Sequence, residues 1–302
     1  MPAIFSPGFF SFWPHIRLLA PLFRSQKILI HGLSSPFLVL YLCLFPGLGK
    51  KCYWVIWGKD LYFYQTLNKK QVHHRIFEFF RKIAIKRIRQ VITFNNGDFE
   101  LAKQWYGCEA QQFKSFMYPS NLFHDYPCIQ TQRDKLTILL GNSADSSNRH
   151  LETFDLLAEQ LDDNFELLVP LSYGNKQYTE LVLERGRQLF GTQFTPLTDF
   201  IPFEQYLELL QRVDIAVFAH RRQQAMGNIT TLLGMKKKVY IRSDISTWNL
   251  LKDLDITVFN LSNFDLAEID DEVAAKNREI VKNVFSEENL LSQWREIVSH
   301  KT

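Results

Sequence analysis

The 302-residue sequence is poor in cysteine and has no long hydrophobic run. The cysteines form no CxxC pair and lack metal-ligand spacing, which argues against structural zinc and a disulfide framework and predicts reduced thiols, as in a cytoplasmic protein. They are Cys43, Cys52, Cys108 and Cys128. The most apolar stretch, residues 36–46, is eleven residues long, whereas a membrane-spanning helix needs about 20. It predicts a buried helix instead, with Ser34 and Ser35 able to cap it and Pro36 in its first turn.

Signals for export and for disorder are also weak. The N-terminal segment is rich in Phe and Pro but has no basic leader before an apolar core, so it matches a signal peptide poorly. Apolar residues make up 46% of the chain and charged residues 22%, which is the composition of a globular protein. The length predicts two domains of about 150 residues each.

The net charge of +3 hides an uneven distribution. Residues 1–130 contain 16 Lys+Arg and 6 Asp+Glu, a net charge of +10. Residues 131–302 contain 19 Lys+Arg and 26 Asp+Glu, a net charge of −7. A basic half joined to an acidic half indicates that the basic half faces a polyanion or an anionic membrane.

The second half alternates between short apolar runs and helical periods. This pattern predicts a parallel sheet covered on both faces, in which ligands bind at the carboxyl ends of the strands. The loops after Leu140, Pro170 and Ala219 are therefore expected to share a cleft. The predicted strands are residues 136–140, 165–170, 214–219 and 238–241, and the predicted helices are residues 148–161, 176–190 and 203–212.

The first half is less regular but fits a second, less complete α/β domain. Polarity rises and periodicity lapses over residues 126–135, so we place the boundary there, with domains 1–128 and 129–302. We expect the last helix to pack back on the first domain. The predicted strands are residues 27–31, 53–57 and 90–94, and the predicted helices are residues 36–45 and 69–89.

The loop of residues 141–150 (GNSADSSNRH) follows a predicted strand and enters a helix. Its small, hydroxyl and amide residues, together with backbone N–H groups and a helix N-terminus, suit a phosphate or sugar hydroxyls. The alternative is an ordinary loop in which Ser146 or Ser147 caps the helix. No Walker or GxGxxG pattern is present.

Two further loops follow predicted strands. Residues 221–228 (RRQQAMGN) suit a diphosphate, because Arg can bind it bidentately and Gly227 allows close backbone approach. The alternative is a solvated charged loop. Tyr173 and Gly174 either stack on a nucleobase or form a turn. Three such loops at the ends of three strands point to a ligand more strongly than each alone.

In the first half, Trp57-Gly58-Lys59-Asp60 follows a predicted strand. Asp60 can act as a general base and Trp57 can stack on a sugar ring. In the alternative, which spacing alone favours, Asp60 caps the next helix and Trp57 belongs to the core. His31, at the end of another predicted strand, has the same two interpretations.

Two other segments carry charge patterns that are typical of binding sites. Asp253 and Asp255 form a DxD string, but in an acidic region between a helix and a strand a solvated turn is the better interpretation, so we expect no metal. Residues 69–89 contain eight Lys+Arg and a single Glu78, with Phe77, Phe80 and Ile83 near helical spacing. Such a helix either lies on an anionic membrane, reversibly with salt, or packs on the core with a solvated basic face. Nucleic-acid binding is not expected, because no recognition fold accompanies it.

The polar motifs also carry a family resemblance, in order from about residue 28 to the end. They are His31-Gly32, Trp57-Gly58-Lys59-Asp60-Leu61-Tyr62, Gly141-Asn142-Ser143-Ala144-Asp145, Ser147-Asn148-Arg149-His150, Val169-Pro170 with Tyr173, Asp214-Ile215, Arg222-Gln223-Gln224 with Gly227, Trp248, and Phe285-Ser286 with Trp294. The sequence resembles the 4-alpha-L-fucosyltransferase-like family of the dTDP-N-acetylfucosamine:lipid II N-acetylfucosaminyltransferase. That family completes the enterobacterial common antigen repeat at the bacterial inner membrane.

The resemblance implies the GT-B type of α/β fold, in which two Rossmann-like domains face a cleft. It implies that the C-terminal domain binds a nucleotide-sugar without a divalent metal or other cofactor, and that the basic N-terminal domain meets the acceptor on the membrane. Family members have a longer N-terminal domain with a His-rich glycine loop. Either the first 27 residues here replace it or the sequence begins late in the pattern, so we expect an incomplete N-terminal domain without a catalytic base or acceptor contact from that loop.

These inferences combine into one hypothesis. The chain is expected to move an N-acetylfucosamine-type sugar from a dTDP-sugar to a polyprenyl-diphosphate-linked saccharide, at the cytoplasmic face of the inner membrane. Backbone N–H groups of the Gly141 loop and Arg222 would stabilise the leaving diphosphate. Alternatives are another surface-glycan pathway (capsule, lipopolysaccharide or glycoprotein), or a catalytically silent homologue that binds nucleotide-sugar or scaffolds a glycan-assembly complex. The expected catalytic residues are Asp60 and His31, the acceptor-binding residues Trp57 and Gly58, and the donor-binding residues Gly141, Asn142, Ser143, Asp145, Ser147, Asn148, His150, Tyr173, Arg222, Gln223, Gln224, Gly227 and Asn228.

Overall fold

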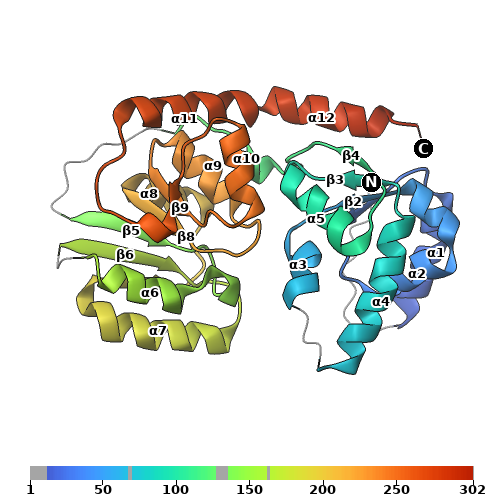
Figure 1. The fold of residues 1–302 in the computed structure, drawn as a ribbon, viewed down its shortest axis with the longest axis horizontal. Helices are drawn as coiled ribbons and strands as arrows, with labels where there is room; N and C mark the ends of the chain where they lie inside the picture. The colour runs from blue at the N-terminus through green and yellow to red at the C-terminus, as the bar shows by residue number, and fades with distance from the viewer. Residues whose placement is uncertain (1–11, 67–69, 127–134, 162–163, 302) are drawn as a thin grey trace. The chain divides into compact units, whose positions relative to one another are not determined.

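A computed structural model describes residues 12–66, 70–126, 135–161 and 164–301. The chain divides into two compact units (Figure 1). The first unit consists of two segments, the chain up to Ser115 and the chain from Gln293 onward. The second unit is Phe116–Ser292. Cys128, Lys69 and most of the predicted boundary region 126–135 lie outside the described residues.

The division after Ser115 differs from the boundary predicted at residue 128, and packing explains the difference. Phe116 lies against Phe285, with ring centroids 5.3 Å apart, and Phe123 N–H donates to the Phe285 carbonyl at 2.8 Å, so this segment belongs to the second unit. At the other end of the chain, His300 lies 4.8 Å from the Phe113 ring within the first unit.

The first unit contains a four-stranded parallel sheet in the order β1-β2-β3-β4. The three predicted strands are confirmed and β4 is additional. The predicted helix 69–89 is present as α4, while α3 directly follows β2. The strands are β1 Ile28–His31, β2 Cys52–Val55, β3 Gln90–Ile92 and β4 Gln111–Phe113. The helices are α1 Phe12–Arg24, α2 Pro36–Leu44, α3 Lys59–Thr66, α4 Val72–Arg87 and α5 Asn96–Tyr106, with a 3₁₀ turn η1 at Pro46–Lys51.

Helix α2 forms where the apolar run predicted it. The Ser35 hydroxyl accepts the Leu38 N–H at 3.4 Å, and Pro36 occupies the first turn, where its missing N–H costs nothing. The helix buries Val39, Tyr41 and Leu42 in the core of the unit. No helix in the described part of the chain combines the length and the apolar character needed to cross a membrane.

The second unit contains a six-stranded parallel sheet in the order β10-β9-β8-β5-β6-β7. The four predicted strands are confirmed. The other two, β7 and β10, are both edge strands: β7 contains Pro196, which only an edge tolerates, and β10 is two residues long. The strands are β5 Leu136–Leu140, β6 Phe165–Pro170, β7 Phe194–Leu197, β8 Ile215–Phe218, β9 Lys238–Ile241 and β10 Phe259–Asn260.

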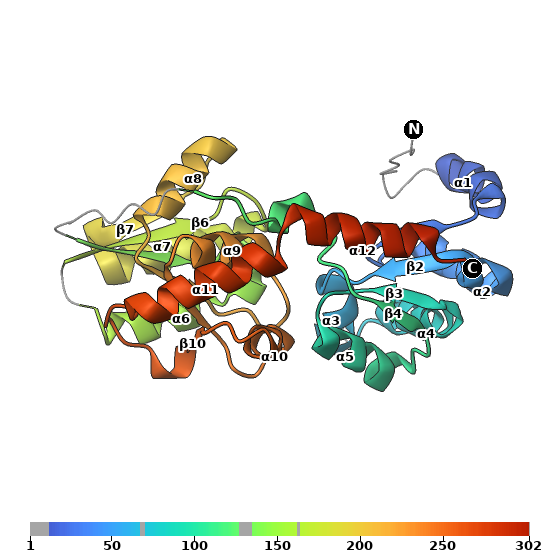
Figure 2. The same cartoon turned by 90° about the horizontal axis from the view of Figure 1, so that it is seen from above.

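Helices cover both faces of this sheet, which buries its central strands. In Figure 1, α6 and α7 lie on one face, and α9 and α11 on the other. Figure 2 shows α11 running along α9. The helices are α6 His150–Ala158, α7 Lys176–Phe190, α8 Phe203–Arg212, α9 Met226–Gly234, α10 Ser246–Asp253 and α11 Asp271–Val284, with 3₁₀ turns η2 Pro119–Asn121, η3 Ser146–Asn148, η4 Gly191–Gln193 and η5 Leu261–Asn263. The last helix, α12 Glu287–Ser299, begins in the second unit and belongs to the first from Gln293 onward.

The strand order places a topological switch point between β5 and β8. From β5 the chain builds outward through β6 and β7, then returns to the other side of β5 and continues through β8, β9 and β10. This is the order of doubly wound Rossmann sheets, in which ligands bind at the carboxyl ends of the strands beside the switch point. The loops after β5 and β8 therefore flank the expected crevice.

Candidate functional site

The loop after β5 begins with a glycine that no other residue can replace without rearrangement. Gly141 has a φ of +72°, and a Cβ there would lie 2.7 Å from His150 Nε2 and 2.8 Å from Asn148 Oδ1. Its N–H donates to the Val217 carbonyl of β8 at 2.9 Å. Gly141 thus lets the chain leave the sheet and fold tightly over two buried polar side chains.

Asn148 holds this loop together from inside. Its side chain is fully buried, and its amide nitrogen donates to the carbonyls of Ser143 (2.9 Å) and Asp145 (3.1 Å) and to the Ser143 hydroxyl (3.2 Å). Its Oδ1 accepts the Asn142 N–H at 3.1 Å and lies 2.7 Å from His220 Nε2. Because the amide nitrogen faces only acceptors, Oδ1 must accept from His220, whose proton is therefore on Nε2.

The three predicted loops meet through side chains. Gln224 Nε2 donates to Asn142 Oδ1 at 2.9 Å, and Asn142 Nδ2 donates to the Tyr173 hydroxyl at 3.0 Å. The Ser147 hydroxyl donates to Gln224 Oε1 at 2.8 Å and accepts from Arg222 at 3.3 Å. The loops after β5, β6 and β8 thus form one network, as the sequence predicted.

Several predicted donor-binding residues are enclosed within the loop. Ser143, Asn148 and His150 are buried, so their side chains shape the interior of the loop. The His150 N–H donates to the Tyr178 hydroxyl at 3.1 Å. Burial lowers the pKa of His150 to about 4 and that of His220 to about 3, so both imidazoles are neutral at pH 7.

Most backbone N–H groups of this loop donate to internal hydrogen bonds, which leaves few for the diphosphate that the sequence predicted them to bind. The Ala144 N–H donates to the Tyr173 carbonyl at 2.8 Å, and the Ser147 N–H donates to Asp145 Oδ1 at 2.9 Å. The other N–H groups that donate within the unit are those of Gly141, Asn142, Asn148, Arg149 and His150. An anion at this edge must therefore rely mainly on side chains.

Three arginines that were not named among the predicted donor-binding residues supply such side chains. Arg149, Arg221 and Arg242 follow β5, β8 and β9, which are adjacent strands, so they lie at the same edge of the sheet. Burial lowers the pKa of Arg149, and the charges of Arg221 and Arg242 lower it further. Arg149 pairs with Glu152, and Arg242 pairs with Asp244 at 2.6 Å. Arg149 and Arg221 lie within the two predicted loops, and Arg242 directly follows β9. The adjacency of β5, β8 and β9 in the sheet was the signal that could have added all three to the site.

Two predicted donor-binding residues have another role. A Cβ on Gly227 would lie 2.6 Å from the Ser120 carbonyl oxygen, so this glycine allows α9 to approach the turn η2. The Asn228 side chain donates to the Tyr206 hydroxyl at 3.0 Å. Both residues therefore contact other parts of the second unit. The close backbone approach predicted at Gly227 is present, and its partner is the Ser120 carbonyl.

In the first unit, Asp60 anchors two loops. Its Oδ2 accepts from Trp54 Nε1 at 2.6 Å and from the Leu33 N–H at 2.9 Å, and its Oδ1 accepts the Trp57 N–H at 3.0 Å. Only 4% of the residue is exposed. A carboxylate held in this way positions the ends of β1 and β2, and the geometry gives no support to the predicted base role.

The other residues predicted in the first unit lie at the same edge. Trp57 is 52% exposed and its ring lies 6.3 Å from that of His31, edge to face. Gly58 directly precedes α3, and its carbonyl accepts the Tyr62 N–H at 2.8 Å. Partial burial lowers the pKa of His31, so its imidazole is neutral at pH 7. The buried tryptophan of this segment is Trp54.

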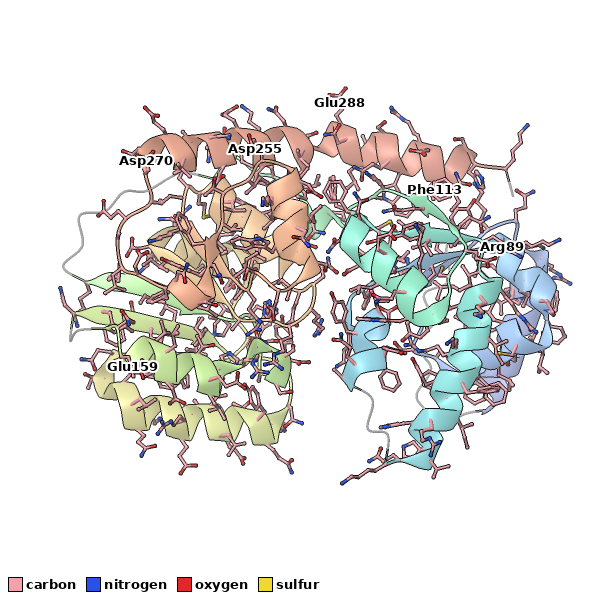
Figure 3. The ribbon with its side chains drawn as sticks, in the orientation of Figure 1. Arg89, Phe113, Glu159, Asp255, Asp270 and Glu288 are labelled. Atoms are coloured by element: carbon pink, nitrogen blue, oxygen red, sulfur yellow. The ribbon has the colours of Figure 1, made fainter. Side chains whose placement is uncertain are left out.

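The DxD string is a turn. Asp253 ends α10, and Asp255, which Figure 3 labels, adopts a φ of 60° and forms an exposed ion pair with Lys276 at 2.6 Å. Within the ranges that the structure describes, no three His, Cys, Asp or Glu side chains stand close enough together to hold a metal ion.

Most of the chain matches a known family. A family model described as 4-alpha-L-fucosyltransferase, glycosyl transferase group 56, matches residues 18–302. This chain belongs to that family. The resemblance found in the sequence is confirmed at this level, and the chain is a glycosyltransferase.

Solved structures of low sequence identity share the fold. A glycosyltransferase from Rickettsia africae has a TM-score of 0.62 and 16% identity, over 97% of this chain and 83% of that one. HepE from Anabaena, solved with UDP-glucose, has a TM-score of 0.67 and 12% identity, over 95% of this chain and 82% of that one. A trehalose-phosphate synthase from Burkholderia vietnamiensis has a TM-score of 0.62 and 10% identity, over 93% of this chain and 75% of that one. The GT-B fold class is thereby confirmed.

Proposed function

We propose that this family member transfers an N-acetylfucosamine-type deoxyamino sugar from a dTDP-sugar to a polyprenyl-diphosphate-linked saccharide. The reaction would serve bacterial surface polysaccharide assembly at the cytoplasmic face of the inner membrane. The observation that carries the donor half is the network of three polar loops at the switch point, beside clustered arginines. A nucleoside diphosphate matches both the position and the positive charge.

In this proposal the arginines carry most of the diphosphate recognition. The acceptor hydroxyl attacks the anomeric carbon, the bond from that carbon to the phosphate oxygen breaks, and its electron pair leaves with the diphosphate. Arg222 lies 3.9 Å from Asp145 and contacts Ser147, so it is oriented before substrate binds. Arg149, Arg221 and Arg242 add positive charge at the same edge, which lowers the energy of the departing dianion without a metal.

The acceptor half rests on the first unit. Trp57 offers an exposed ring to a sugar, and His31 beside it is neutral, which is the state that can accept the proton of the attacking hydroxyl. Asp60 acts as a positioning residue because it fixes the loops that carry both side chains.

Calorimetric titration with dTDP tests the donor half. Arg222→Ala removes a charged hydrogen-bond donor and should weaken binding by about 1.5–3 kcal/mol. Arg185→Ala is the matched control, because Arg185 is paired with Asp155 on the exposed side of α7 and should leave affinity unchanged. Equal affinity in both variants would remove Arg222 from the site.

Turnover of a dTDP-deoxyamino sugar by the purified protein tests the transfer itself. Release of dTDP that requires a polyprenyl-diphosphate disaccharide supports the proposal, and release should persist in EDTA. Binding of dTDP without turnover on any lipid-linked acceptor would favour a catalytically silent homologue.

A further inference from the structure

Helix α4 carries apolar residues on two opposite faces. One face packs into the core of the first unit through Ala84 and Ile85. The other is exposed: Val72 is 65% accessible, Ile76 52%, Phe79 64% and Phe80 38%. These positions follow the spacing i, i+4, i+7 and i+8, so they form one row along the helix.

Helix α2, the neighbour of α4, also exposes apolar side chains. It packs beside α4, where Cys43 Sγ lies 3.3 Å from the Phe80 carbonyl and Arg87 donates to the Leu42 carbonyl at 2.9 Å. Leu40 and Leu44, one turn apart on α2, are exposed. We define the exposed apolar face as Val72, Ile76, Phe79 and Phe80 of α4.

Positive charge borders this face along α4. Arg75, Lys82 and Lys86 are exposed at the spacing i, i+7 and i+11, which places them in a row adjacent to the apolar one. Arg89, labelled in Figure 3, follows the end of the helix. The acidic residue of α4, Glu78, is neutralised by Arg81 at 2.7 Å.

We propose that the exposed apolar face inserts into the interface of an anionic lipid bilayer while the basic row contacts the lipid headgroups. An apolar helical face bordered by Lys and Arg is the arrangement that lies in the headgroup–acyl boundary, about 5–10 Å deep. A protein partner would need an apolar surface edged with acidic residues. A bilayer of anionic lipid supplies both properties at once, so we commit to lipid.

The proposal changes what the sequence predicted. Phe77 and Ile83 are partly buried, and Phe77 packs on the core, so the exposed row is instead the one that contains Phe79. Because apolar insertion is not screened by salt, part of the binding must survive high ionic strength. Lipid binding needs no nucleotide-sugar, so its test is independent of the proposed reaction.

Sedimentation of the full chain with vesicles tests the proposal. The wild type should pellet with vesicles of phosphatidylethanolamine and phosphatidylglycerol, more strongly than with phosphatidylcholine, and should stay partly bound at high salt. The variant Ile76→Ser/Phe79→Ser should reduce the partition coefficient about tenfold or more at both salt concentrations. The control Leu181→Ser/Leu291→Ser changes exposed apolar side chains on α7 and α12 and should bind like the wild type.

Fluorescence locates the inserted side chain. The vesicles contain phosphatidylglycerol mixed with brominated phosphatidylcholine, which quenches tryptophan fluorescence in the bilayer. The fluorescence added by Phe79→Trp should be quenched by these vesicles, whereas that added by Leu181→Trp should not. Equal pelleting of wild type and Ile76→Ser/Phe79→Ser, or complete release at high salt, would overturn the proposal. So would a lipid-free dimer that Ile76→Ser/Phe79→Ser dissociates, because a second copy would then cover the face. Unchanged dTDP binding in that variant shows that the second unit remains folded.

Discussion

Replacing Asn148 with alanine should destabilise the second unit more than any surface substitution in the same loops. The change deletes the buried amide that joins Ser143, Asp145 and His220. It leaves the His220 Nε2–H and the Asn142 N–H without their acceptor, at about 1–3 kcal/mol for each buried donor. Because Asn142 is only partly buried, we expect a total loss of about 3–4 kcal/mol.

Urea-induced unfolding followed by circular dichroism measures this loss. Asn175→Ala is the matched control: Asn175 is exposed, and its side chain accepts the Tyr178 N–H at 2.9 Å as the N-cap of α7. Losing such a cap costs about 1 kcal/mol. If Asn148→Ala costs no more than Asn175→Ala, then the amide does not hold the loop together and our account of the site geometry is wrong. Affinity for dTDP should fall in Asn148→Ala and remain in Asn175→Ala.

The remaining predictions concern pH, positioning, packing and metal. The fold keeps His150 and His220 neutral, so their contribution to the unfolding free energy should be fully present above pH 6.5. The unfolding free energy should fall by about 1.4 kcal/mol per pH unit for each group as the pH drops toward 4, and urea midpoints at pH 7 and pH 5 would reveal the loss. Asp60→Ala should lower the unfolding free energy by about 2–4 kcal/mol, whereas lost turnover at unchanged stability would restore its role as base. Gly227→Ala should lower the melting temperature because its Cβ meets a backbone carbonyl, and Gly47→Ala, whose Cβ meets nothing within 4 Å, should not. Binding of dTDP should be unchanged by EDTA, and a strict need for magnesium or manganese would contradict the metal-free proposal.

The arrangement of the second unit could be read from the sequence because its strands are short, apolar and separated by helical periods. Buried parallel strands must be apolar on both faces, so the runs at β5, β6, β8 and β9 were distinct. Parallel order then brings the loops that follow them to one edge. The predicted meeting of Asn142, Tyr173 and Gln224 followed from these two facts alone. The edge strands β7 and β10 lacked this signal, since one contains proline and the other has two residues.

The direction in which each polar side chain points was decided only by the tertiary structure. Asn148 and His150 lie in the same loop as Ser147, yet the chain turns the first two into the protein and links Ser147 to Arg222. Asp60 likewise became an anchor because the Leu33 N–H, 27 residues away in the sequence, donates to it together with the Trp54 indole. Sequence spacing fixes which residues share an element, through the periods of the helix and the strand. It does not fix which donors and acceptors a polar group meets, because those partners come from segments that only packing brings together.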